Sequence, residues 1–296
     1  MTSVQPDLMS ETSFNITEEI FDAILPAGGH ISGEFAGQAG IDIKALIPFG
    51  GQTILERAID TLRATGRVRR IVVVGAEQAL QVAKRCGIEG TVAEGATGPE
   101  NNILGLKWLQ SQPGGATNRV LITTTDLPFL TSQTLNAYID ACPADADVAI
   151  PLVTRAAYEK RFPGSAIEYV RLRDGEFTVG CTFVVNAATL LANLHHFERA
   201  FAARKSNLRM ARLAGARIAW RLLTRQLTVR DIEARASLIA HCRGVAVFDT
   251  PAELAYDIDV PEEYTYAVKH CQPYSSDRTP ISSPERTVNP RQEAAG

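Results

Sequence analysis

The sequence predicts an α/β fold: a doubly wound, mostly parallel (mixed) sheet with helices on both faces and a helical insertion. Near-continuous apolar runs such as 70–75 and 119–124 are typical of strands buried on both faces. Segments with apolar residues at helical spacing alternate with these runs, which indicates crossover helices between parallel strands. The chain has 296 residues, 45% of them hydrophobic and 21% charged. That composition can bury a large core and excludes collagen, coiled-coil and mostly disordered proteins.

The first half of the chain alternates short apolar strands with helical patterns. A buried strand is predicted over 22–27, followed by a glycine-rich loop. Apolar residues then recur at helical spacing within 52–65. The elements that follow are a strand over 70–75, helices over 77–86 and 101–110, and a strand over 119–124.

In the second half, from about residue 146, strands and helices no longer alternate regularly. Strands are predicted over 148–153, 166–172 and 176–186, with few helices between them. A long helical region of about 187–241 forms the insertion. The last elements are an apolar run over 245–248 and a helix that begins near Pro261.

No internal repeat divides the chain. We therefore expect one domain over 21–270, preceded by a flexible segment over 1–20 and followed by a disordered tail over 271–296. The tail is rich in Ser, Pro and Arg and has no apolar period.

Charge, chain ends and cysteines narrow the class of protein. The formal net charge of −3 disfavours a basic nucleic-acid binder. Residues 1–20 lack the pattern of a secretory signal, and no uncharged apolar run approaches the roughly 18 residues of a membrane span. The 5 cysteines are scattered and odd in number, which favours a reducing compartment over a disulfide framework or zinc site. We expect a cytoplasmic protein with no transmembrane segment and no nucleic-acid partner.

The first segment with chemical potential is the glycine-rich loop that begins with Leu25. Glycines after a strand allow backbone amides to approach phosphate oxygens, and Lys44 can neutralise their charge. The same residues are also compatible with a plain turn and a lysine in solvent.

The second segment is Thr123 to Pro128, at the end of a predicted strand. In open α/β sheets ligands bind beyond the carboxyl ends of the strands, where Asp126 could hold a hard cation such as Mg²⁺. Alternatively, Asp126 caps the helix that begins near Thr131.

The third segment is Asp257 to Tyr264. Asp257 and Asp259 alternate along an extended stretch, so both carboxylates point to the same side before Pro261 opens a helix. Alternatively, they form an acidic helix start that the helix dipole favours.

In this order, the three segments resemble the motifs of the nucleotidyltransferase superfamily with the glycosyltransferase type-A fold, in particular the molybdenum-cofactor cytidylyl- and guanylyltransferases. The Leu-Ala-Ala-Gly-Gly motif of that branch is matched by 25–29, its lysine by Lys44 and its glycine turn by 49–55. Its Asp-x-Pro motif is matched at Asp126, and its late acidic element by 257–263.

The resemblance implies a Mg²⁺-dependent transfer of a nucleoside monophosphate from a nucleoside triphosphate to a small phosphorylated acceptor, such as a cofactor or sugar phosphate, with release of pyrophosphate. Asp126, Asp257 and Asp259 would hold Mg²⁺. Lys44 would stabilise charge on the α-phosphate and the leaving pyrophosphate. The implied nucleotide-binding residues are Leu25, Ala27, Gly28, Gly29, Gly75, Asn101 and Asn102, although either asparagine could instead cap a helix.

The first loop departs from the family pattern. No arginine lies between the glycines and Lys44, and Glu34 adds negative charge there. Two alternatives therefore stay open: a glycosyltransferase that uses a nucleotide-sugar on the same fold, and a non-catalytic nucleotide-binding regulator.

The insertion carries nine basic residues and no acidic residue between Arg199 and Arg230, together with an apolar stripe. One interpretation is a packed helix with a solvated basic face. Another is a site for the phosphorylated acceptor, with Arg204, Lys205 and Arg209 nearest the cleft. A third is weak attachment to an anionic membrane surface or to a partner.

Overall fold

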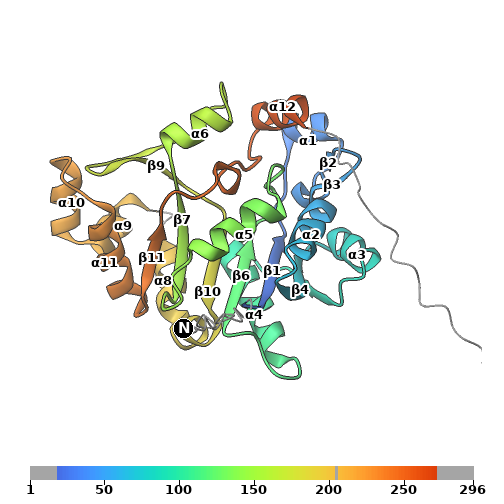
Figure 1. Cartoon of the computed structure of the whole chain (residues 1–296), viewed down its shortest axis with the longest axis horizontal. Coiled ribbons are helices and arrows are strands. Elements are labelled where there is room, and N and C mark those ends of the chain that lie inside the picture. Colours follow the sequence, from blue (N-terminus) through green and yellow to red (C-terminus); the bar gives the residue numbers. More distant parts are fainter. Residues whose placement is uncertain (1–18, 204–205, 272–296) are drawn as a thin grey trace, which may run out of the picture.

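The centre of the molecule is a nine-stranded sheet, seen in a computed structural model that describes residues 19–203 and 206–271 (Figure 1). Four neighbouring strands run parallel: β5 (Gly90–Ala93), β4 (Val68–Gly75), β1 (Phe21–Ala27) and β6 (Arg119–Thr123). The sheet continues through β10 (Thr182–Asn186), β7 (Val148–Thr154), β9 (Gly175–Val179) and β8 (Val170–Leu172), with β11 (Gly244–Val247) parallel to β7. Because β10 is antiparallel to both β6 and β7, the sheet is mixed, and the predicted fold class is confirmed.

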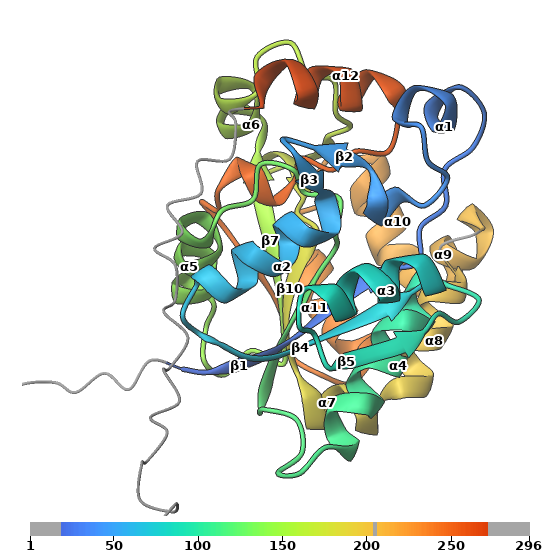
Figure 2. The ribbon, with the colours of Figure 1, turned by 90° about the vertical axis from the view of Figure 1, so that its right-hand side faces the viewer.

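Alternate residues of the central strands bury opposite faces of the sheet. In β1, Ala23 and Leu25 pack in one core cluster, whereas Ile24 packs in another. The helices of the first face are α2 (Ile54–Ala64), α3 (Glu77–Arg85) and α5 (Ser132–Ala141) (Figure 2). Those of the second face are α4 (Gly98–Ser111), α7 (Ala187–Ala192) and α8 (Leu194–Ala203). Two covered faces explain why these strands read as continuous apolar runs.

A third, aromatic-rich cluster packs among short elements. It includes Phe129, Phe162 and Tyr256, whose ring centroids lie within 5.0 Å of one another. The short elements here are α1 (Gly33–Ala39), η1 (Lys44–Leu46), β2 (Pro48–Phe49), β3 (Gln52–Thr53), α6 (Arg155–Arg161), η2 (Ala252–Leu254) and α12 (Pro261–His270). Neither α1 nor α6 was predicted from the sequence.

The predicted strand over 176–186 is broken between β9 and β10. The amide of Gly180 donates to Pro151 O, and that of Cys181 donates to Leu254 O. A Cβ at Gly180 would lie 2.8 Å from Pro151 Cγ, so only glycine permits this close approach. The strand predicted over 166–172 is present only in its last three residues, β8.

The helical insertion consists of several short helices. After α7 and α8 come α9 (Asn207–Ala214), α10 (Ala216–Leu223) and α11 (Val229–Ala240). Gly215, at φ +86°, separates α9 from α10, because L-residues with a side chain rarely adopt that conformation. Within the described residues, no helix is long and apolar enough to cross a membrane. The predicted terminal segments lie almost wholly outside the described residues, so the domain boundaries stay predictions.

A buried carboxylate fastens the start of β1. Asp22 is fully buried and accepts hydrogen bonds from the guanidinium groups of Arg69 and Arg70 and from the amide of Thr117, at 2.8–3.1 Å. Burial alone would raise the pKa of Asp22, but these hydrogen bonds outweigh burial and lower the pKa below its usual 3.8.

We expect Asp22→Asn to reduce the free energy of unfolding by about 3 kcal/mol at neutral pH, because two arginines lose their shared charged acceptor. Since the folded-state pKa lies below 3.8, the carboxylate stabilises the fold above that value, and this contribution is lost as the pH falls through the folded-state pKa. The difference between wild type and variant in urea unfolding should therefore shrink in acid. A difference that stays constant down to acidic pH would contradict this role.

Candidate active site

The three sequence segments meet at the carboxyl edge of the parallel strands. β1 and β6 are adjacent and parallel, so Gly28, which follows β1, and Asp126, which follows β6, lie at the same edge. The amide of Ile258 donates to Asp126 O at 3.2 Å, which joins the late acidic segment to this edge. Residues more than 200 positions apart are thus brought into one site.

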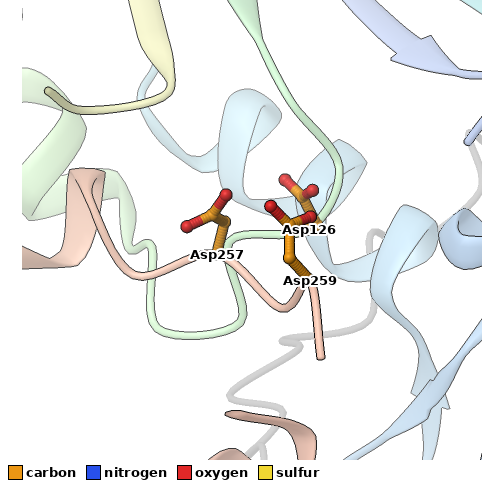
Figure 3. Close-up of side chains that lie close together, drawn as sticks. All are labelled: Asp126, Asp257 and Asp259. Atoms are coloured by element: carbon orange, nitrogen blue, oxygen red, sulfur yellow. The ribbon is translucent and has the colours of Figure 1, made fainter. Parts of the chain in front are cut away.

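Three carboxylates cluster there. One oxygen each of Asp126, Asp257 and Asp259 lies within 4.8 Å of the others, and Figure 3 shows the carboxylates of Asp126 and Asp259 side by side with that of Asp257 next to them. Asp126 is 9% exposed, and its Oδ1 is buried with no hydrogen-bond partner among the described residues. Oxygen ligands of this kind suit a hard divalent cation such as Mg²⁺ or Mn²⁺.

Lys44 lies between two of these carboxylates. Its ammonium forms ion pairs with Asp126 and Asp259, and its side chain is 14% exposed. Burial lowers the pKa of Lys44, but the two negative charges outweigh burial and raise the pKa above its usual range. The amide of Lys44 also donates to Gly29 O at 2.8 Å, which fixes η1 against the glycine loop. Lys44 is therefore a permanent cation inside the acidic cluster, and not a solvent lysine.

The helices that follow Asp126 and Asp259 are capped by other side chains. Thr131 caps α5, since its hydroxyl accepts from the amide of Thr134 at 3.2 Å. At α12, the carboxylate of Glu263 accepts from the amides of Asp259 and Val260. The side chains of Asp126 and Asp259 cap neither helix, and both form ion pairs with Lys44.

Asp257 responds most strongly to this crowding. Burial, followed by the negative charges of Asp126 and Asp259, raises the pKa of Asp257 from 3.8 to about 7, although Lys44 acts in the opposite direction. Because the pKa of Asp257 is raised in the folded chain, the chain without a cation loses stability as the pH rises from 3.8 to about 7.

We expect the affinity of the wild-type chain for Mn²⁺ to rise as the pH increases through about 7. The reason is that Asp257 must release its proton before its carboxylate can bind a cation. Isothermal titration calorimetry across a pH series measures this, and Asp257→Asn should bind more weakly and with a flatter pH profile. An affinity of the wild type that does not change across that range would contradict the pKa assignment.

A cleft of about 420 Å³ adjoins the acidic cluster. Its walls are formed by residues from the ends of β1, β6 and β10, by Lys44 and by the loop that starts α4. Of the residues expected to bind nucleotide or metal, the cleft is lined by Gly28, Gly29, Lys44, Asn101, Asn102 and Asp126. The side chains of Leu25 and Ala27 are buried in the core. Gly75 packs against Ala27, since a Cβ at position 75 would lie 2.8 Å from the carbonyl oxygen of Ala27.

Gly28 lies close to two side chains. A Cβ at this position would lie 2.0 Å from Glu94 Oε2 and 2.9 Å from Asn101 Nδ2. We expect Gly28→Ala to weaken nucleotide binding by about tenfold or more, because the side chains of Glu94 and of Asn101, which lines the cleft, must move. Gly37→Ala is the matched control, since a Cβ there has no atom within 4 Å. The thermal shift with each nucleotide plus Mg²⁺ measures the effect, and equal shifts in Gly28→Ala and wild type would refute it.

The two asparagines of α4 have different surroundings. Thr97 caps the helix, and Asn101 is 4% exposed and accepts from the amide of Gly95 at 2.7 Å. Asn102 Oδ1 is buried in the cleft wall without a partner among the described residues. Asn101 thus shapes the loop at the cleft, whereas Asn102 offers an acceptor to a ligand.

The basic residues of the insertion are only partly described. Arg204 and Lys205 lie outside the described residues. Arg209, on α9, is exposed and lines a second cleft of about 830 Å³. The two clefts share the wall formed by 97–99. Arg209 therefore lines the neighbouring cleft and is not part of the acidic cluster.

Sequence reasoning missed Glu94 and the course of the first loop. Glu94 directly follows β5, a strand that was not predicted, and its Oε1 lies 3.4 Å from His30 Nε2. The loop forms α1, which packs on α12: Phe35 contacts Tyr264, and Gln38 donates to Thr265. Glu34 on α1 is exposed and does not line the described cleft, so its charge lies outside that cleft.

A model of the MobA-like NTP transferase domain matches residues 24–229, more than half of the chain. The chain belongs to this family. It is therefore a transferase enzyme of the nucleotidyltransferase class, which disfavours the non-catalytic alternative. Asp257 and Asp259 lie outside the matched residues, and the fold brings their carboxylates close to that of Asp126.

Solved structures share the fold of this chain. The chain is similar to a hypothetical transferase from Thermus thermophilus, at 30% identity and a TM-score of 0.72, over 82% of this chain and 99% of that one. It also shares its fold with 4-diphosphocytidyl-2C-methyl-D-erythritol synthase from Anaerococcus prevotii, at 15% identity and a TM-score of 0.54, over 85% and 97% of the two chains. No curated protein matches the sequence.

Proposed function

We propose that this member of the MobA-like NTP transferase family is a Mg²⁺-dependent nucleotidyltransferase. It would transfer a nucleoside monophosphate from a nucleoside triphosphate to a small phosphorylated acceptor and release pyrophosphate. The observation that carries the proposal is the cluster of Asp126, Asp257 and Asp259 around Lys44, at the mouth of a glycine-lined cleft. Neighbouring positive and negative groups of this kind suit a polyphosphate together with its cation.

The donor set fits the cation. All three side chains offer hard oxygen ligands, and Asp126 Oδ1 is buried without a partner among the described residues. Asp126 and one or both of Asp257 and Asp259 would hold Mg²⁺. When bound, Mg²⁺ supplies neutralisation of the triphosphate charge and polarisation of the reacting phosphoryl group.

The residues of the chain would divide the remaining work. Backbone amides around Gly28 and Gly29 would bind the phosphates, and Lys44 would stabilise charge on the α-phosphate and the leaving pyrophosphate. The acceptor phosphate is already a nucleophile, so in-line attack needs no general base. Burial and the nearby aspartates raise the pKa of the Cys181 thiol, which keeps it protonated and out of the chemistry. Positioning and electrostatics would carry the rate.

Recognition of base and acceptor is assigned to the walls of the two clefts. Asn102, supported by Asn101 and the strand end at Gly75, would contact the base. Arg209, with Arg204 and Lys205, would bind the anionic acceptor. Cys86, Cys142, Cys181 and Cys242 form no disulfide, which supports our proposal that the enzyme works in the reducing cytoplasm.

Pyrophosphate release, screened across the four nucleoside triphosphates with a panel of sugar and cofactor phosphates, tests the proposal. We expect one pair to react in Mg²⁺, no reaction in EDTA, and loss of the reaction in Asp126→Ala. A chain that instead takes an intact nucleotide-sugar and releases a nucleoside diphosphate is a glycosyltransferase. Wild-type activity in Asp126→Ala would overturn the assignment.

A further inference from the structure

We propose that the outer face of α10 attaches this enzyme to the surface of an anionic lipid bilayer. The proposal concerns the helical insertion and is independent of nucleotidyl transfer. α10 lies at the far edge of the molecule, beside α9 and α11, at the left of Figure 1. None of its residues is buried.

The first observation is a group of apolar side chains left in water. Trp220 is 69% exposed, Leu223 is 79% exposed and Leu222 is 54% exposed. Trp220 and Leu223 are three residues apart and therefore share one face of the helix. Met210, on the adjoining α9, is 37% exposed. Large apolar side chains gathered on one exposed element point to a surface that is covered in use.

The second observation is the charge around these side chains. Arg212, Arg217 and Arg225 are exposed, and none of them pairs with a carboxylate of the described residues. Arg221 is paired with Asp231, so the charge of that carboxylate is already neutralised. Glu233, also on α11, accepts the amide of Ala246. The face therefore combines unpaired positive charge with exposed tryptophan and leucine.

An anionic bilayer satisfies both features. Its headgroups attract arginine, and tryptophan and leucine at the end of a short helix can enter the boundary between headgroups and acyl chains. A second copy of this chain would place its arginines against those of the first, with no acidic residue between 199 and 230 to offset them. A nucleic-acid backbone would pair with the arginines but leave the leucines in water.

Flotation of the full chain with lipid vesicles tests the proposal. We expect binding to vesicles of phosphatidylcholine and phosphatidylglycerol, weaker binding in high salt, and little binding to phosphatidylcholine alone. Trp220→Ala/Leu223→Ala should reduce binding about tenfold or more. Arg217→Gln/Arg225→Gln provides a second variant that leaves the apolar residues in place, and it should also bind more weakly. Val268→Ala, which truncates a half-exposed valine on α12, should bind like wild type.

Each variant should keep the nucleotide-induced thermal shift, because α10 does not line the cleft of the acidic cluster. Equal binding to neutral and anionic vesicles, or no binding, would overturn the proposal. So would wild-type binding by the Trp220→Ala/Leu223→Ala variant. If light scattering shows that the wild type is a dimer and that this variant is a monomer, the face instead joins two copies of the chain.

Discussion

Asp126→Asn is expected to lower kcat for nucleotidyl transfer by about 10³-fold, the largest effect of any single substitution in the site. Asparagine has nearly the same shape but lacks the charge. Asp126 is the most buried member of the acidic cluster, and its Oδ1 has no other partner among the described residues. The backbone oxygen of residue 126, which accepts from Ile258, is unchanged by the substitution, so the late acidic segment should stay in place.

Steady-state pyrophosphate release with saturating nucleotide and acceptor measures this effect. Asp145→Asn is the matched control, because Asp145 is exposed and pairs with Arg243, which directly precedes β11 at the edge of the sheet opposite to the site. The control should react at the wild-type rate. An Asp126→Asn enzyme within a few-fold of wild type would remove Asp126 from the mechanism.

Lys44→Met should have two opposite effects. We expect kcat to fall by about 10²–10³-fold, because the charge that builds on the phosphates loses its nearest fixed cation. We expect Mn²⁺ without nucleotide to bind about tenfold more tightly, because Asp126 and Asp259 lose the ammonium that neutralises them. The geometry thus predicts that Lys44 and the divalent cation compete for two carboxylates until a triphosphate draws the lysine away.

Rate and Mn²⁺ affinity should be measured on the same preparations. Lys84→Met on α3 is the control, since Lys84 is exposed and does not line the cleft. If Lys44→Met loses activity without any gain in Mn²⁺ affinity, Lys44 acts in catalysis but does not compete with the cation for Asp126 and Asp259.

The sequence was sufficient to predict the part of the site that depends on strand ends. Apolar runs located β1 and β6, and parallel strands present their carboxyl ends at one edge, so Gly28 and Asp126 could be placed together. Asp257 and Asp259 were singled out by their alternation, and the fold brings both carboxylates close to that of Asp126. The contact of Asp259 with Lys44 depends on the return of the chain after β11, which no local pattern encodes.

The parts that were missed are set by tertiary contacts. β5 has only four residues, so its end at Glu94 carried no apolar run long enough to detect. The break at Gly180 depends on the approach of Leu254, which is far away in the sequence. α1 forms because Phe35 and Gln38 find partners on α12. This is why the charge of Glu34, which the sequence placed near the phosphates, lies on an exposed helix.

We propose that Asp126, with one or both of Asp257 and Asp259, holds one divalent cation. Titration of the wild-type chain with Mn²⁺ alone, followed by the electron paramagnetic resonance signal of the free ion, tests this most directly. We predict one bound ion per chain, with an affinity that Asp126→Asn weakens by about tenfold or more and Asp145→Asn leaves unchanged. Binding of equal affinity in wild type and Asp126→Asn would contradict the account.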